Sequence, residues 1–144
     1  MIEIGSAVRE NRSIFTAAII QLCHGLVELI DSTAIVLITI GLLPNLYLPF
    51  VTGNVEIYAM LENMPVVFIP IFWCFTTLRL VSAYWIFGNK IKGFWLAIFV
   101  SGVTLLAAFF LLPFGAFDMV PTLPVVVLLF NGYFRDRKIV EEED

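Results

Sequence analysis

The chain alternates between long apolar runs and short polar stretches, and four of the runs are long enough to cross a membrane. The runs cover about residues 14–43, 65–88, 93–112 and 119–134. A bilayer core about 30 Å thick is spanned by a helix of about 20 apolar residues. Proline or glycine lies near most run ends, as expected where helices start and stop. The pattern predicts an all-α integral membrane protein, a four-transmembrane-helix bundle forming a single domain over residues 1–144.

The composition supports this fold class. Apolar residues make up 60% of the 144 residues, charged residues only 14%, and the mean hydropathy is +0.98. A soluble domain carries about 25% charged residues. The numbers therefore exclude a soluble enzyme and a nucleic-acid-binding protein, and they make the lipid bilayer the expected partner. The polar segment 1–13 and the length of the first run argue against a cleavable signal peptide.

The basic residues predict the orientation of the chain. Seven of the eight lie on one side of the predicted spans, and they are Arg9, Arg12, Lys90, Lys92, Arg135, Arg137 and Lys138. The links on the other side, 44–64 and 113–118, contain no Lys or Arg. Because basic loops stay in the cytoplasm, we expect a multi-pass protein of the cell membrane with both termini cytoplasmic.

Two polar segments have their own predictions. The long outer link 44–64 is expected to contain a short amphipathic helix over about 54–62, capped by Asn54. That helix would either close over the ends of the spans or cover a bound ligand. The sequence predicts an acidic tail over residues 139–144, whose four final acids, 141–144, are expected to be solvated.

Four polar residues share one face of the first span. At about 100° per residue, Gln21, His24, Glu28 and Asp31 fall within about 80° of one another. A charged side chain costs several kcal/mol when it meets lipid, about 2.5–3.5 kcal/mol at the centre of a span. This face must therefore meet protein or water.

Arg79 in the second span lies at a matching depth. It is about 13 Å from the cytoplasmic end of its helix, and His24 is about 15 Å from the corresponding end of the first. Because consecutive helices pack as neighbours, we expect Arg79 to form an ion pair with Glu28. One negative charge is then left over from Glu28 and Asp31, to be neutralised by a proton on one acid, a protonated His24 or a bound cation. Burial penalises the charged carboxylate, which favours a shared proton.

Asp118 precedes the fourth run and has two interpretations. It either caps the start of that helix, or it lies inside the membrane and faces a pocket near Asp31. Pro121 and Pro124 are expected to kink the helix or to make its start irregular. In the third span, small residues on one side predict close helix packing, and they are Ala97, Ser101 and Ala108.

Two functions follow from these residues. The first is binding of a small molecule, lipid or proton in a polar pocket formed by Gln21, His24, Glu28, Asp31, Arg79 and Asp118. The second is a structural or partner-binding tetraspan whose buried charges only stabilise the bundle. The sequence carries no motif of a soluble-type active site, so neither an enzyme, a cofactor nor a metal is expected. The uncovered helix surface of so small a bundle is compatible with a homo-oligomer.

A third function comes from a resemblance. The chain shows an arginine-containing helix, a basic turn and a Trp-led helix followed by a Pro-x-Gly-x-x-Asp turn, at Arg79, 88–92, Trp95, Pro113, Gly115 and Asp118. This half of the chain resembles a broad group of small, mostly uncharacterised prokaryotic four-span proteins. The pair His24–Gly25 is loosely similar to the DoxX-like family, some members of which are membrane subunits of quinone-linked oxidoreductases. The resemblance implies the four-span fold and adds a membrane subunit of a redox complex to the alternatives.

Overall fold

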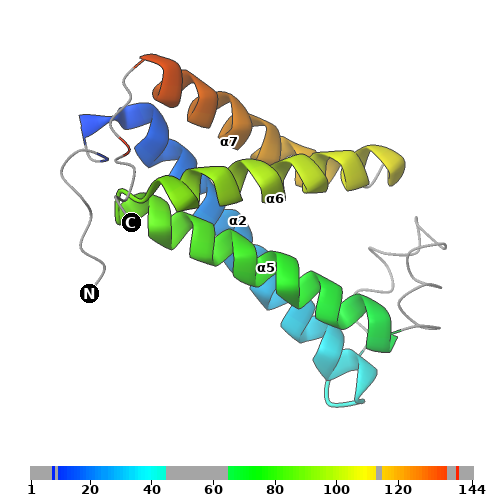
Figure 1. The fold of residues 1–144 in the computed structure, drawn as a ribbon. Coiled ribbons are helices and arrows are strands. Elements are labelled where there is room, and N and C mark those ends of the chain that lie inside the picture. The colour runs from blue at the N-terminus through cyan, green and yellow to red at the C-terminus, as the bar shows by residue number, and fades with distance from the viewer. Residues whose placement is uncertain (1–7, 9, 45–64, 113–114, 136–138, 140–144) are drawn as a thin grey trace. The chain divides into compact units, whose positions relative to one another are not determined.

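The described part of the chain is built on four long helices (Figure 1). The computed structural model describes residues 8, 10–44, 65–112, 115–135 and 139. The helices are α2 (Arg12–Thr39), α5 (Pro65–Phe87), α6 (Ile91–Phe110) and α7 (Ala116–Arg135). Each contains a segment long and apolar enough to cross a membrane. The predicted helical class, with four apolar helices in this order, is confirmed.

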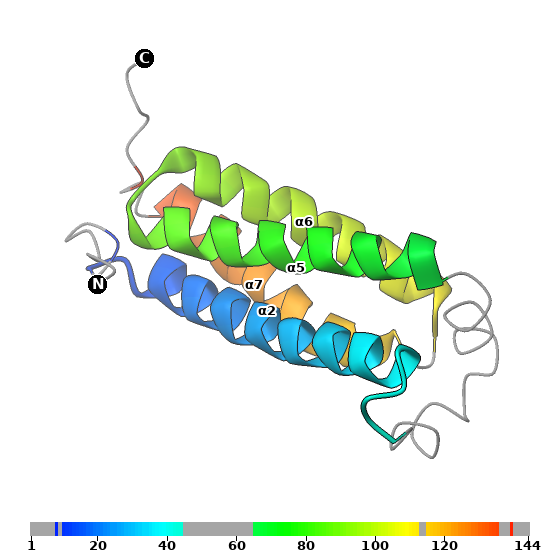
Figure 2. The same cartoon turned by 90° about the horizontal axis from the view of Figure 1, so that it is seen from below.

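Contacts within the chain group it into two compact units. The first unit comprises residues 1–25 and 77–144, and the second comprises residues 26–76. The first unit thus contains the start of α2, the last part of α5, and all of α6 and α7 (Figure 2). The second unit contains the remaining parts of α2 and α5. The predicted helix over about 54–62 lies outside the described residues.

The first unit brings the start of α2 to the end of α7. Asn11 is the N-cap of α2, because its Oδ1 accepts a hydrogen bond from the Ile14 N–H at 3.3 Å. Its amide nitrogen donates to the Gly132 carbonyl at 3.1 Å. A side chain on residue 132 would meet Ile14 Cγ1 at 2.7 Å. Glycine at this position therefore allows α7 to pack directly against α2.

Aromatic contacts tie the other helix ends to the same end of the first unit. Phe15 of α2 meets Phe87 of α5 edge-on, with ring centroids 6.0 Å apart. Phe94 of α6 stacks on Tyr133 of α7 at 4.7 Å. The starts of α2 and α6 and the ends of α5 and α7 therefore lie together.

An apolar core fills this end of the unit. Its fully buried members include Ile14, Ala17, Ala18, Ala83, Ile86, Phe94, Ala97, Val125 and Leu129. Ala97, Ser101 and Ala108 are all buried, so the small-residue face of the third span packs as predicted. Ile139 is also buried in this core. The first residue of the predicted acidic tail is therefore buried, and the rest of that tail, with the four acids expected to be solvated, lies outside the described residues.

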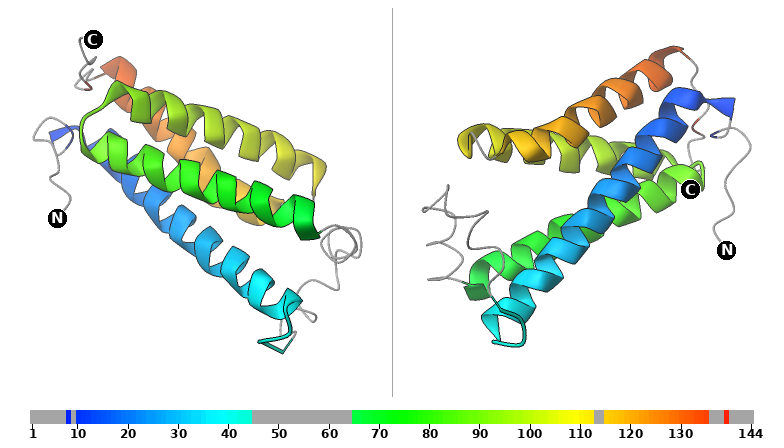
Figure 3. Two further views of the ribbon diagram at one scale, coloured as in Figure 1. Left: turned by 60° about the horizontal axis from the view of Figure 1, so that its bottom comes forward. Right: turned by 180° about the vertical axis from the view of Figure 1, so that it is seen from behind.

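The start of α7 differs from its prediction. The Gly115 carbonyl already accepts hydrogen bonds from the N–H groups of Asp118 and Met119, at 3.1 and 3.0 Å. Asp118 is thus the third residue of the helix, and its interpretation as the N-cap is wrong. Pro121 and Pro124 lie inside α7, where each removes a backbone hydrogen bond. Figure 3 shows that α7 changes direction along its length, as the predicted kink requires.

The end of α2 also comes earlier than predicted. The first run was expected to remain helical to residue 43, but α2 ends at Thr39. Gly41 has a φ of +77°, and the N–H groups of Leu42 and Leu43 both bond to the Leu37 carbonyl. A glycine in the left-handed conformation just after a helix closes its last turn in this way.

Candidate functional site

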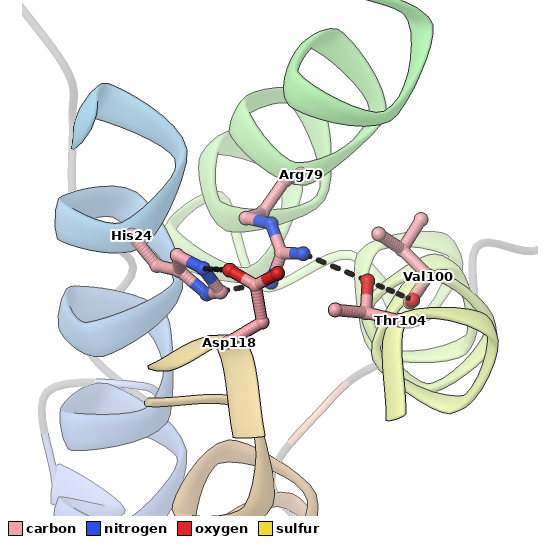
Figure 4. A network of polar contacts seen from close by, with 5 residues as sticks. All are labelled: His24, Arg79, Val100, Thr104 and Asp118. Carbon is pink, nitrogen blue, oxygen red and sulfur yellow. Dashed lines mark hydrogen bonds and ion pairs between the residues drawn. The ribbon is translucent and has the colours of Figure 1, made fainter. Parts of the chain in front are cut away.

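A chain of polar contacts crosses the interior of the first unit, with one side chain from each of the four helices. We call it the His24–Arg79 network, and it comprises His24 of α2, Arg79 of α5, Thr104 of α6 and Asp118 of α7 (Figure 4). Arg79 lies at its centre and is completely buried, with 0% of its surface exposed.

Arg79 is held by two neighbours on different helices. Its Nη1 lies 2.8 Å from Nδ1 of His24, and its Nη2 donates to Oγ1 of Thr104 at 2.9 Å. The Thr104 hydroxyl in turn donates to the Val100 carbonyl at 2.9 Å. Since that bond uses the only hydroxyl proton, a lone pair of Thr104 faces the guanidinium. The position of Arg79 is therefore fixed from both sides.

The contact with Arg79 determines the tautomer of His24. A guanidinium has only N–H donors, so Nδ1 of the imidazole must act as the acceptor. The neutral ring then carries its proton on Nε2. This nitrogen lies 3.7 Å from Oδ1 of Asp118, which is longer than a hydrogen bond but within ion-pair range. The imidazole thus lies between a buried cation and a carboxylate.

The two ends of the network differ in exposure. Arg79 is fully buried and only 6% of the His24 side chain is exposed, but 54% of the Asp118 side chain is exposed. The cation is therefore enclosed by protein, while about half of the carboxylate side chain lies at the surface of the unit.

Gly25 provides room for Leu80, the residue that follows Arg79. A Cβ at this position would lie 2.9 Å from the Leu80 side chain and 3.5 Å from Cδ of Arg79. Because residue 25 has no side chain, α5 can lie close to α2, and the apolar stem of Arg79 fits between the two helices. The pair His24–Gly25 therefore combines an acceptor for Arg79 with space for the neighbouring Leu80 side chain.

Gln21 lies one turn before His24 and takes part in a second polar contact. Its amide nitrogen donates to Ser82 Oγ at 3.3 Å. The Ser82 hydroxyl donates to the Arg79 carbonyl at 2.7 Å. The structure thus places Gln21, His24, Arg79 and Asp118 in one unit.

Glu28 and Asp31 belong to the second unit. Glu28 is partly buried, Asp31 is exposed, and the Ser32 hydroxyl donates to the Glu28 carbonyl at 2.7 Å. The predicted ion pair between Arg79 and Glu28 stays a prediction, as does the joining of these two acids with His24 in one pocket. For Asp31, its exposure does not agree with the buried position expected from the sequence.

Two members of the polar interior were not predicted as site residues. Thr104 and Ser82 are hydroxyl residues within apolar helices, a pattern that is common wherever helices pack closely. In the sequence, only their positions could have pointed to a role. Ser82 lies one turn from Arg79 on α5, and Thr104 lies one turn from the small residue Ser101 on α6. The partner of each could be identified only from the structure.

The fold and the network together define the class of protein. It is a helical protein with four candidate membrane-spanning helices, which suggests a membrane protein, and a buried arginine lies among them. No protein-family model, curated protein or solved structure matches the chain. The resemblance to DoxX-like proteins stays a prediction, and the function has to be argued from the site.

Proposed function

We propose that this protein is a small polytopic protein of the cell membrane, with both termini cytoplasmic, which binds a proton at its His24–Arg79 network. The observation that carries the proposal is the geometry at His24. One imidazole nitrogen accepts from a completely buried guanidinium, and the other lies 3.7 Å from a half-exposed carboxylate.

Charge balance supports this function. Inside a membrane, a charged side chain is costly unless an opposite charge or a polar group faces it. Arg79 and Asp118 have opposite charges and are linked through a neutral His24. When Asp118 takes up a proton, the buried guanidinium loses this countercharge, so protonation changes the electrostatics of the whole network. Intramembrane groups with this property are typical of proton-linked sites.

Charged and polar groups from three other helices surround His24. α5 contributes Arg79, α7 contributes Asp118, and α6 contributes the Thr104 hydroxyl through Arg79. On α2 itself, Glu28 follows His24 by four residues. In the structural alternative, these groups would only lock the helices together and no proton would be exchanged. A redox subunit would instead bind a quinone or a soluble partner.

The chain contains a single histidine, which allows a direct test. Protein labelled with ¹⁵N-histidine and reconstituted in bilayers gives one pair of imidazole nitrogen signals. At neutral pH we expect an unprotonated Nδ1 and a protonated Nε2. Between about pH 8 and about pH 4, which covers the ordinary ranges of histidine and carboxyl groups, these signals should change in the wild type. They should follow a different pH profile in Asp118→Asn.

A matched control is Glu10→Gln, which removes an exposed acid before α2 and should leave the profile unchanged. If the His24 signals remain constant over the whole range in the wild type, the network binds no proton and the structural alternative holds. An equal response in wild type and Asp118→Asn would exclude Asp118 as part of the site.

A further inference from the structure

Three completely buried polar side chains near the network have an atom without a hydrogen-bond partner among the described residues. The atoms are Oε1 of Gln21, Oγ of Ser101 and Oγ1 of Thr122, and each residue is 0% exposed. Buried polar atoms in proteins are nearly always paired, either with protein atoms or with ordered water. These three therefore need an explanation, and their positions in the helices provide one.

Close helix contacts show that Thr122 is level with His24. The glycine contact described above sets Gly132 of α7 opposite Ile14 of α2. His24 follows Ile14 by ten residues, and Thr122 precedes Gly132 by ten. Because the start of α2 lies at the end of α7, the two helices run in opposite directions. Equal residue counts from a shared contact therefore bring His24 and Thr122 to about the same level in the unit, to within about one turn given the bend of α7.

A second contact places Ser101 at the same height. A Cβ on Gly115 would overlap the backbone of Ala108, so α6 and α7 touch at these two residues. Ser101 precedes Ala108 by seven residues, and Thr122 follows Gly115 by seven. Gln21 is three residues before His24, about 4.5 Å along α2 at 1.5 Å per residue. The three unpaired atoms therefore belong to three helices, at levels that differ by about one helical turn at most.

We propose that Gln21, Ser101 and Thr122 form a buried water-binding site. A buried water typically makes about three hydrogen bonds, which equals the number of unpaired atoms. The Gln21 oxygen can accept from the water, while each hydroxyl can donate to it or accept from it. A metal cation fits less well, because the site contains no carboxylate and the Arg79 guanidinium lies nearby.

The site joins α2, α6 and α7 by hydrogen bonds that no protein group provides. It also places the water at about the level of the His24–Arg79 network, where a polar neighbour lowers the cost of burying a charge. The inference does not depend on proton binding by Asp118. It rests on burial, on the unpaired atoms and on helix register alone.

Gln21 is the only glutamine in the chain, so its side-chain amide can be observed selectively. In ¹⁵N-glutamine-labelled protein in bilayers, we expect solid-state NMR to show rapid magnetisation transfer from water to this amide. The double variant Ser101→Ala/Thr122→Val should lose the transfer. Its Tm should be lower than that of the wild type by roughly 2–4 °C, because bonds to the water are lost.

Thr33→Val is the matched control, since it makes the same chemical change at an exposed position of α2 and should alter neither reading. Absence of transfer in the wild type would overturn the proposal, and this measurement needs no variant. Persistence of the transfer in the double variant would also overturn it, because the water would then be bound elsewhere. A double variant as stable as the wild type would mean that the hydroxyls bind nothing.

Discussion

Arg79 is the residue on which the polar interior depends. A buried guanidinium needs acceptors for its N–H groups and a countercharge. His24 and Thr104 supply acceptors, and Asp118 supplies a negative charge through the imidazole. The depth match between His24 and Arg79 could be predicted from the sequence, because rise per residue is constant in a helix. The tautomer of His24 could not, since it depends on which nitrogen meets the guanidinium.

Replacing Arg79 by Leu should destabilise the protein by about 3 kcal/mol, because the polar groups that face it would lose their partner. Denaturant unfolding in micelles measures this loss. Double-mutant cycles then identify the countercharge. One cycle combines Arg79→Leu with Asp118→Asn, and the other combines it with Glu28→Gln. If the acid that is replaced pairs with Arg79, the double variant should be less destabilised than the sum of the two single changes.

Additive effects with Glu28→Gln would contradict the predicted Arg79–Glu28 ion pair. Additive effects with Asp118→Asn would show that the 3.7 Å contact between His24 and Asp118 does not couple Asp118 to Arg79. The conservative change Arg79→Lys should be intermediate in stability. It keeps the charge but loses the planar fork that reaches His24 and Thr104 at once.

The helices themselves were largely predictable from the sequence. Length and hydropathy are local properties, and the bounds of α5 and α6 lie within two residues of their predictions. The larger errors are at Gly41 and Asp118, where backbone hydrogen bonding decides the helix end. The start of α7 was predicted three residues too late. Asp118 therefore lies in the first turn of the helix and is not its N-cap.

Helix packing depends on glycines at contact points, which gives a prediction at this scale. Gly132→Ala should destabilise the protein by about 1–3 kcal/mol, because the new methyl group would lie 2.7 Å from Ile14. Gly102→Ala is the control, since a Cβ there has no neighbour within 4 Å among the described residues. Alanine is the better helix former, so this change should be neutral or should stabilise by about 0.5–1 kcal/mol.

Thermal unfolding of both variants under one condition gives the comparison. A Gly132→Ala variant as stable as Gly102→Ala would show that α7 does not approach α2 as closely as the structure has it.

At the scale of the whole molecule, the meeting of four helix ends in the first unit supports the proposed orientation. The exposed basic residues Arg12, Lys90, Lys92 and Arg135 flank these ends. The start of α2 and the end of α7 therefore lie at the same end of this unit. If the protein spans the cell membrane as proposed, this end faces the cytoplasm.

Cysteine labelling tests the orientation. In a background with Cys23 and Cys74, both free thiols, replaced by Ser, a single cysteine is placed at Lys92 or at Leu112. In intact cells, a membrane-impermeant maleimide should label Leu112→Cys but not Lys92→Cys. The reverse pattern would show inverted insertion, and labelling of both would show dual topology.

The sequence by itself determined the four long apolar helices of the described chain, their order and the segregation of basic residues. These properties follow from local requirements, since each span needs about 20 apolar residues and internally bonded backbone. Only the tertiary structure decided which polar residues meet. Helix rotation and register depend on close contacts such as Gly132–Ile14 and Gly25–Leu80, which involve residues far apart in the chain. Such contacts between helices allow Asp118 to lie 3.7 Å from His24 and His24 to lie 2.8 Å from Arg79.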